Sequence, residues 1–295
     1  GYHIWFYDRN FALHFLHKQF EVALANCNQA IALKPDFANA YSNRGIALQA
    51  LKKLEAAIDS YTVAINLDPS YAEAYSNRGS VFEELKQFEA ALADYQTAMN
   101  LNPNIDYLFG TVQHIKIQIC DWTDFIQNTS ELSRKIRANE KASPCLTVLA
   151  LSTSLADQHQ AASIWVMDKY PKNLCLGSIP KRPSQPKIRI GYYSADFYNH
   201  ATSYLMAELF ERHDKDQFEL IAFSFNSNNK DQMNSRVSQA FDQFIDVAFM
   251  SDKEVAQMSR KLAVDIAVDL KGLTQNERLG IFAYQAAPIQ VSYLG

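Results

Sequence analysis

The sequence predicts an α-helical tetratricopeptide solenoid followed by an α/β Rossmann-like domain. Three observations carry this prediction: a 34-residue repeat in the first third, a proline cluster near residue 183, and alternating strand-like and helical runs after it. We expect tetratricopeptide repeats over 1–103 and a helical transition region over 104–178. A Pro-rich linker over 179–187 and a Rossmann-like domain over 188–295 should follow.

Several residues recur in the first third at a spacing of 34. The prolines Pro35, Pro69 and Pro103 follow this spacing, and the string Ala-Tyr-Ser-Asn-Arg-Gly occurs at 40–45 and again at 74–79. This period is typical of tetratricopeptide units, each a pair of antiparallel helices. Three units are predicted. The other recurring positions are Ala23, Ala57 and Ala91, and Ala30, Ala64 and Ala98.

Residue sizes in the repeats match the demands of helix pairing. Gly45 and Gly79 have no side chain at the point where the first helix of a unit must approach the second. The first unit departs from the others, because its first helix aligns only with one extra residue near His17, which places Asn10 where Gly45 stands. We therefore expect an irregular turn between the helices of the first unit.

Stacked repeats form an extended concave surface, and two asparagines recur on their first helices. Asn43 and Asn77 could hold the backbone of an extended peptide, because an amide offers both donors and an acceptor. They could equally be solvated polar positions of a helix surface. The repeat pattern alone leaves both interpretations open.

The middle of the chain predicts further helices and then a break. Helical patterns cover 105–120, 125–139 and 156–169. The segment Ile179–Pro186 contains three prolines, which excludes a helix and marks a domain boundary.

Strand-like and helical patterns alternate after this boundary, which predicts a parallel sheet covered by helices. The predicted strands are Lys187–Tyr193, Phe218–Phe225, Phe244–Val247, Asp265–Leu270 and Ile289–Leu294, and the predicted helices are Thr202–His213, 231–241, Ser251–Leu262 and 278–285. Thr202 or Ser203 is expected to cap the first of these helices.

Two loops of the predicted sheet carry candidate chemistry. His200 lies in the loop 194–201, just before a helix whose positive end favours a neutral imidazole, suited to accept a proton or donate a hydrogen bond. Asp269 and Lys271 open the second loop, where they form a polar cluster or pair with each other. A lone histidine in a loop is commonly structural, so the pattern alone does not establish catalysis.

Composition excludes several classes of function. The formal net charge is −4 with interspersed acids and bases, so no nucleic-acid or anionic-membrane partner is indicated. The four cysteines are scattered and favour a reducing cytoplasm without a zinc site, and no apolar run is long enough to span a bilayer. There is no GxGxxG, GxxxxGK[ST] or GxSxG motif. The chain begins without Met and ends directly after a strand-like run, which we interpret as a fragment of a longer protein.

Three blocks resemble the protein O-linked N-acetylglucosamine transferase family, particularly its bacterial, SPINDLY-like members. They are Ile190–Ser203, which contains Ser-Ala-Asp-Phe-Tyr-Asn-His, then Val268–Gln275 and Ala287–Gly295. The resemblance covers essentially the whole chain, including the repeats. It implies the first half of a glycosyltransferase-B-type fold.

The resemblance also implies an activity. Members are inverting enzymes without a metal cofactor that transfer N-acetylglucosamine from UDP-N-acetylglucosamine to Ser or Thr of acceptor proteins held by the repeats. On this basis Asn43 and Asn77 contact the acceptor, and His200 lies in the active site as a general base or as part of the pocket. The substrate cleft would also involve Asp196, Asp269, Lys271 and Thr274.

The resemblance places the nucleotide-binding half beyond Gly295, so this chain alone is expected to be inactive. Two alternatives remain open from the sequence. One is a protein O-fucosyltransferase that uses GDP-fucose, and the other is a non-catalytic tetratricopeptide scaffold.

Overall fold

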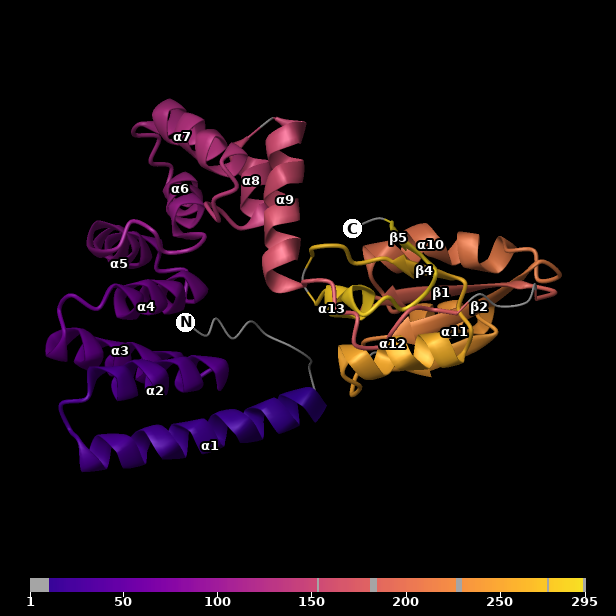
Figure 1. The fold of residues 1–295 in the computed structure, drawn as a ribbon, viewed down its shortest axis with the longest axis horizontal. Coiled ribbons are helices and arrows are strands. Elements are labelled where there is room, and N and C mark those ends of the chain that lie inside the picture. The colour runs from indigo at the N-terminus through magenta and orange to yellow at the C-terminus, as the bar shows by residue number, and fades with distance from the viewer. Residues whose placement is uncertain (1–10, 153, 181–184, 227–229, 275, 294–295) are drawn as a thin grey trace. The chain divides into compact units, whose positions relative to one another are not determined.

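The computed structural model describes residues 11–152, 154–180, 185–226, 230–274 and 276–293, with side chains from residue 19 onward. It divides into two compact units, a helical one over Leu16–Lys169 and a sheet-containing one whose main part is Tyr170–Gly295. In Figure 1 the helical unit runs from indigo to magenta, and the strands lie in the orange and yellow part of the chain.

The helical unit consists of consecutive antiparallel helices. They are α1 (Phe11–Leu33), α2 (Ala38–Ala50), α3 (Leu54–Leu67), α4 (Ala72–Glu84), α5 (Phe88–Leu101), α6 (Leu108–Gln118), α7 (Phe125–Arg137), α8 (Cys145–Leu151) and α9 (Leu155–Lys169). The pairs α2–α3 and α4–α5 are the two regular repeats that the 34-residue period predicts.

Glycine and alanine have the predicted packing role in these repeats. A Cβ atom on Gly45 would lie 2.6 Å from the ring of Tyr61, and one on Gly79 would lie 2.8 Å from the ring of Tyr95. Ala57 and Ala91 are fully buried on the facing helices. The small residues therefore make room for the tyrosines that fill each helix pair.

The first repeat differs from the prediction. We expected a turn near His17, but α1 runs without interruption from Phe11 to Leu33. This stretch contains neither glycine nor proline, so nothing in it interrupts the helical hydrogen bonds. Asn10 lies outside the described residues.

The transition region contains one helix that the sequence did not predict. Helix α8 has seven residues and follows Pro144, which is too short a segment for a clear helical period. The neighbouring helix α6 begins at Leu108, later than the expected Ile105, after Tyr107 in a left-handed conformation.

The second unit is a five-stranded parallel sheet. Its strands are β1 (Ile188–Ser194), β2 (Phe218–Ser224), β3 (Gln243–Asp246), β4 (Ile266–Asp269) and β5 (Ile289–Ser292), in the order β3-β2-β1-β4-β5. The intervening helices are α10 (Ala201–Arg212), α11 (Gln232–Ala240), α12 (Asp252–Lys261) and α13 (Leu279–Ala283). The predicted Rossmann-like alternation is confirmed.

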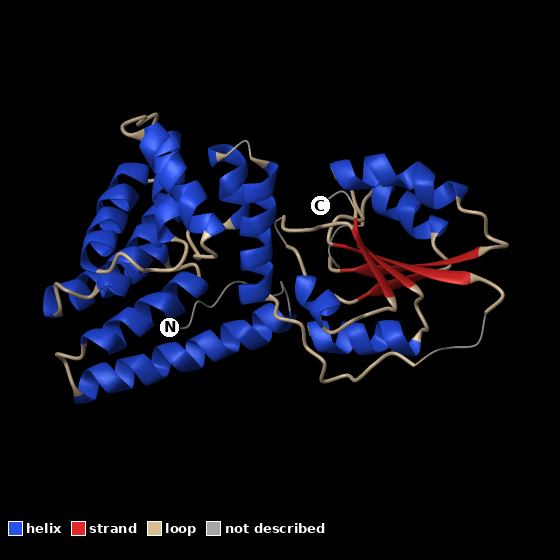
Figure 2. Ribbon diagram, turned by 45° about the horizontal axis from the view of Figure 1, so that its top comes forward, coloured by secondary structure: helices blue, strands red, loops and turns tan. Residues whose placement is uncertain are grey.

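Both faces of the sheet are covered, as Figure 2 shows. Tyr192 and Leu220 pack toward α10 and α11, whereas their neighbours Tyr193 and Ile221 pack toward α12 and α13. Alternate residues of a strand point to opposite faces, which explains why the middle of β1 and of β2 has no charged residue on either face.

The segment after α9 packs with the sheet. The Tyr170 hydroxyl donates to Glu277, the Asn173 N–H donates to the Ala283 carbonyl, and the Arg260 guanidinium donates to the Leu176 carbonyl. The division between units thus lies before the Pro-rich linker predicted over 179–187, of which 181–184 are outside the described residues. No helix in the described ranges is long and apolar enough to cross a membrane.

Candidate functional site

Two loops leave adjacent parallel strands at the centre of the sheet. Strands β1 and β4 pair with Tyr193 opposite Asp269, so the loops that follow them start at the same edge. The strand order reverses direction between these two strands, because β2 and β3 lie on one side and β5 on the other. Open α/β sheets bind ligands at this switch point, outside the carboxyl ends of the strands.

The two loops are joined by a buried ion pair. The Lys271 Nζ lies 2.6 Å from the Asp196 Oδ2, and both side chains are buried. The sequence left open that Lys271 pairs with Asp269, and this pairing is not formed. Asp196 follows β1 and Lys271 follows β4 by two residues each, so the parallel register brings them together.

Asp269 instead holds the backbone of its own loop. Its carboxylate accepts the N–H groups of Lys271 at 2.9 Å and Gly272 at 3.0 Å. Gly272 has a φ of +53°, a conformation that glycine adopts without strain, and this turn directs both N–H groups toward the carboxylate. Burial raises the pKa of the Asp269 carboxyl group, although both backbone donors oppose the shift.

His200 caps helix α10. Its Nδ1 accepts the Thr202 N–H at 3.2 Å, so the predicted caps Thr202 and Ser203 are wrong by at least two residues. The ring lies beside the ion pair, with Nδ1 3.6 Å from the Asp196 Oδ2, and its side chain is 40% exposed. A neutral imidazole that accepts at Nδ1 carries its proton on Nε2 and offers that N–H as a donor.

Thr274 lies on the same loop, but its hydroxyl is used locally. It donates to the Lys271 carbonyl at 2.6 Å, while the residue itself is exposed. This bond holds the turn that carries Lys271. Its neighbour Gln275, part of the same sequence block, lies outside the described residues.

Two residues that the sequence analysis did not single out hold the His200 loop. The Asp231 carboxylate accepts the Asn199 N–H at 2.7 Å and caps α11 by accepting the Asn234 N–H at 2.8 Å. The Asn234 amide donates to the Phe197 carbonyl at 2.7 Å. An Asp that caps a helix is visible in the sequence as Asp-Gln-Met-Asn, but its bond to a loop 32 residues away is not.

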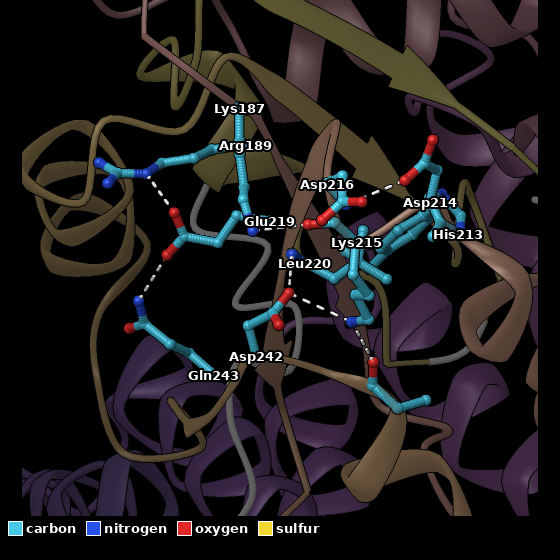
Figure 3. A network of polar contacts seen from close by, with 12 residues as sticks. Lys187, Arg189, His213, Asp214, Lys215, Asp216, Glu219, Leu220, Asp242 and Gln243 are labelled. Atoms are coloured by element: carbon cyan, nitrogen blue, oxygen red, sulfur yellow. Dashed lines mark hydrogen bonds and ion pairs between the residues drawn. The ribbon is translucent and has the colours of Figure 1, made fainter.

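The opposite end of the sheet carries a network of hydrogen bonds and ion pairs between strands. Figure 3 shows Arg189 donating to Glu219, which also accepts from Gln243, and Lys215 beside Asp242. These groups tie the amino ends of β1, β2 and β3 together. They bridge neighbouring strands, so we assign them to stability.

The candidate peptide-binding asparagines lie on equivalent helices of the regular repeats. Asn43 on α2 is exposed and Asn77 on α4 is half-buried. Over the ranges that the structure describes, neither side-chain amide has a hydrogen-bond partner. Their donors and acceptors are thus available, as a peptide-binding role requires. Among those same ranges no three His, Cys, Asp or Glu side chains group as metal ligands.

Family models match both parts of the chain. Residues 152–295 match glycosyl transferase family 41, and tetratricopeptide repeat models match 14–52, 50–86 and 72–105.

Curated relatives come from plants and an animal. The probable UDP-N-acetylglucosamine–peptide N-acetylglucosaminyltransferase SEC of Arabidopsis thaliana is 37% identical over 109 residues, which is 37% of this chain and 11% of the relative. The UDP-N-acetylglucosamine–peptide N-acetylglucosaminyltransferase of Caenorhabditis elegans is 29% identical over 193 residues, 60% of this chain and 17% of the relative. The chain therefore spans less than a fifth of the length of these relatives.

A solved structure is also similar. A mutant of the Thermobaculum terrenum O-GlcNAc transferase aligns with 96% of this chain and 50% of its own length, at 21% identity and a TM-score of 0.49.

Proposed function

The chain belongs to glycosyl transferase family 41 through residues 152–295, and on this premise we propose that it is the acceptor side of a protein O-linked N-acetylglucosamine transferase. The reaction forms a bond between a Ser or Thr hydroxyl of the acceptor and the anomeric carbon of the sugar. The bond from that carbon to UDP breaks, and the hydroxyl proton must leave.

One observation carries the proposal. His200, Asp196 and Lys271 come together at the switch point of the sheet, from two segments that both belong to the family match. Asp196 and Lys271 neutralise each other in the interior, which leaves the partly exposed imidazole as the group that can reach a substrate. This is where a sheet of this order binds its ligand.

The hydrogen bond at Nδ1 defines what His200 can do. With Nδ1 accepting the Thr202 N–H, Nε2 is a donor and can orient the acceptor oxygen or a sugar hydroxyl. To act as a general base through Nε2, the imidazole would have to give up this cap and donate from Nδ1 to Asp196, 3.6 Å away. We propose the orienting role for the state described here.

The repeats supply the protein-binding part of the proposal. Asn43 and Asn77 lie on the first helices of successive units, and their amides have no hydrogen-bond partner among the described residues. We propose acceptor proteins as partners, in the cytoplasm, without a metal cofactor. N-acetylglucosamine is the proposed sugar, because the relatives quoted above carry that donor in their names.

Radiolabelled sugar transfer tests the proposal. A protein extended to the length of its relatives, supplied with an acceptor protein and EDTA, should incorporate label from UDP-N-acetylglucosamine and not from GDP-fucose. The isolated 295-residue chain should incorporate neither. Transfer from GDP-fucose alone would overturn the choice of donor, and no transfer from either donor by the extended protein would favour a scaffold.

A further inference from the structure

Arg44 and Arg78 occupy the same place in two repeats but have different partners. Each is the fifth residue of the string Ala-Tyr-Ser-Asn-Arg-Gly, on α2 and α4 respectively. Each points to the second helix of its own unit, toward Ser60 on α3 and Asp94 on α5. Because the six-residue string is the same in both repeats, we look for the difference in what faces each guanidinium group.

Each of the three Arg78 guanidinium nitrogens has a hydrogen-bond partner in the protein. Its Nε and one terminal nitrogen donate to the two Asp94 oxygens at 2.7 and 2.8 Å, a bidentate pair, and the other terminal nitrogen donates to the Thr62 hydroxyl at 2.9 Å. These contacts raise the pKa of Arg78 further, with the Asp94 hydrogen bond as the largest cause. The third repeat thus contains its own carboxylate for this arginine.

The Arg44 guanidinium lacks that carboxylate. Its Nε donates to the Ser60 hydroxyl at 3.0 Å, and within the described ranges its two terminal nitrogens have no hydrogen-bond or ion-pair partner. Thr62 belongs to the unit before that of Arg78, and the equivalent residue before Arg44 is Asn28 on α1, 34 residues earlier than Thr62. Asp59, next to Ser60, is exposed and forms no hydrogen bond or ion pair with Arg44.

The surroundings of Arg44 fix its orientation. The guanidinium carbon lies 4.9 Å from the centre of the Tyr41 ring, closer than the 5.8 Å that separates Arg78 from Tyr75. Arg44 as a whole is half-buried. Burial raises the pKa of the Cys27 thiol on α1, and the positive charge of Arg44 opposes that shift.

We infer that Arg44 is a binding position for the side-chain carboxylate of a polypeptide held by the repeats, where the ligand provides the group that Asp94 provides to Arg78. A stacked, half-buried guanidinium with two free terminal nitrogens binds a carboxylate in the bidentate way. Asn43 immediately precedes it, and in the part of the chain that the structure describes its amide has no partner and could bind the peptide backbone. This assignment rests on the proposed function only in that the ligand is a polypeptide on the repeat array.

Peptide binding measured without any sugar donor tests the assignment. The probes are a fluorescein-labelled peptide of alternating Ser and Glu and its Ser and Gln counterpart, titrated with the 295-residue chain at low salt. We expect the Glu peptide to bind more tightly, and Arg44→Gln to weaken it by roughly 3- to 10-fold. Ser60→Asp should weaken it similarly, because it gives Arg44 the internal partner of the third repeat.

Two further variants complete the test. Lys53→Gln removes one positive charge from an exposed position of the same repeat and should leave the affinity unchanged. Asp94→Ser frees Arg78 and should tighten binding of the Glu peptide. Equal binding of the Glu and Gln peptides, or equal losses from Ser60→Asp and Lys53→Gln, would overturn the assignment. Since no sugar is transferred, a failure here is separate from a failure of the proposed enzyme activity.

Discussion

The Lys271 ammonium lies 2.6 Å from the Asp196 carboxylate, and this pair joins the loops that follow two adjacent strands. Because both groups are buried, removing one leaves the other as an unpaired charge in the interior. We expect Lys271→Met to reduce the free energy of unfolding by about 3–5 kcal/mol, measured by urea denaturation.

Two further variants show whether pairing is the cause. Lys271→Met combined with Asp196→Leu removes both charges and should recover much of the loss. Arg212→Met breaks an exposed pair with Glu208 and should change stability very little. If Lys271→Met lowered the free energy of unfolding no more than Arg212→Met does, the buried pair would not hold the two loops together.

His200 has two roles that can be tested separately: its imidazole ring faces the candidate site, and its Nδ1 caps helix α10. His200→Ala removes both and should lower the free energy of unfolding by about 1 kcal/mol. His200→Asn keeps a good cap without the ring, so its stability should stay near that of the unchanged protein. In the extended enzyme both variants should lose most of the sugar transfer. Near-normal transfer by His200→Asn would mean that His200 only caps the helix.

The Asp231 carboxylate should control the mobility of the His200 loop. Asp231→Ala removes the acceptor for the Asn199 N–H, which is held at 2.7 Å. Amide hydrogen exchange at Asn199 should become faster, while exchange at Leu220 in the central sheet stays slow. Unchanged exchange at Asn199 would show that other contacts hold the loop.

Asp269 should give the sheet unit a pH-dependent contribution to stability. Burial raises the pKa of its carboxyl group, so the folded protein binds this proton more tightly than the unfolded chain. The contribution favours folding below about pH 4 and is lost as the pH rises through the folded pKa. The difference in unfolding free energy between the unchanged protein and Asp269→Asn should therefore fall as the pH rises from about 4 to 7.

Urea denaturation of the unchanged protein and of Asp269→Asn at several pH values measures this difference in unfolding free energy. Asp36→Asn, at an exposed residue, corrects for the loss of one carboxylate. A difference that stays constant with pH would show that Asp269 titrates alike in the folded and unfolded states.

The repeats could be predicted from the sequence because the same residue types recur in it every 34 positions. Gly45, Ala57 and Pro69 each recur 34 residues later, and the packing of Gly45 on Tyr61 follows from that spacing. The order of strands and helices in the second unit could also be predicted, because the hydrophobic period of a segment depends only on residues close together in the sequence. The predicted turn near His17 was wrong. It rested on the alignment with the other repeats, whereas the stretch from Phe11 to Leu33 contains no glycine or proline that would break a helix.

The sequence predicted which two loops form the candidate site, but not how their side chains pair. His200, Asp269 and Lys271 were chosen because they follow strands, but the partner of Lys271 depends on the register of β1 on β4, which the sequence does not state. Histidine is also not among the preferred caps, so the sequence favoured Thr202 or Ser203 over His200. Asp231 and Asn234 were missed because their contacts join segments that are far apart in the sequence.

The packing of Gly79 on Tyr95 offers a test of the repeat architecture. A Cβ at Gly79 would lie 2.8 Å from the ring of Tyr95, which is buried and donates from its hydroxyl to Glu83. Gly79→Ala should therefore cost about 1–2 kcal/mol despite the better helix propensity of alanine, measured from the helical circular dichroism signal during denaturation. Combined with Tyr95→Leu, the substitution should cost less than the sum of the single effects, because the clash is gone. Strictly additive losses would mean that the ring of Tyr95 does not require a glycine opposite it.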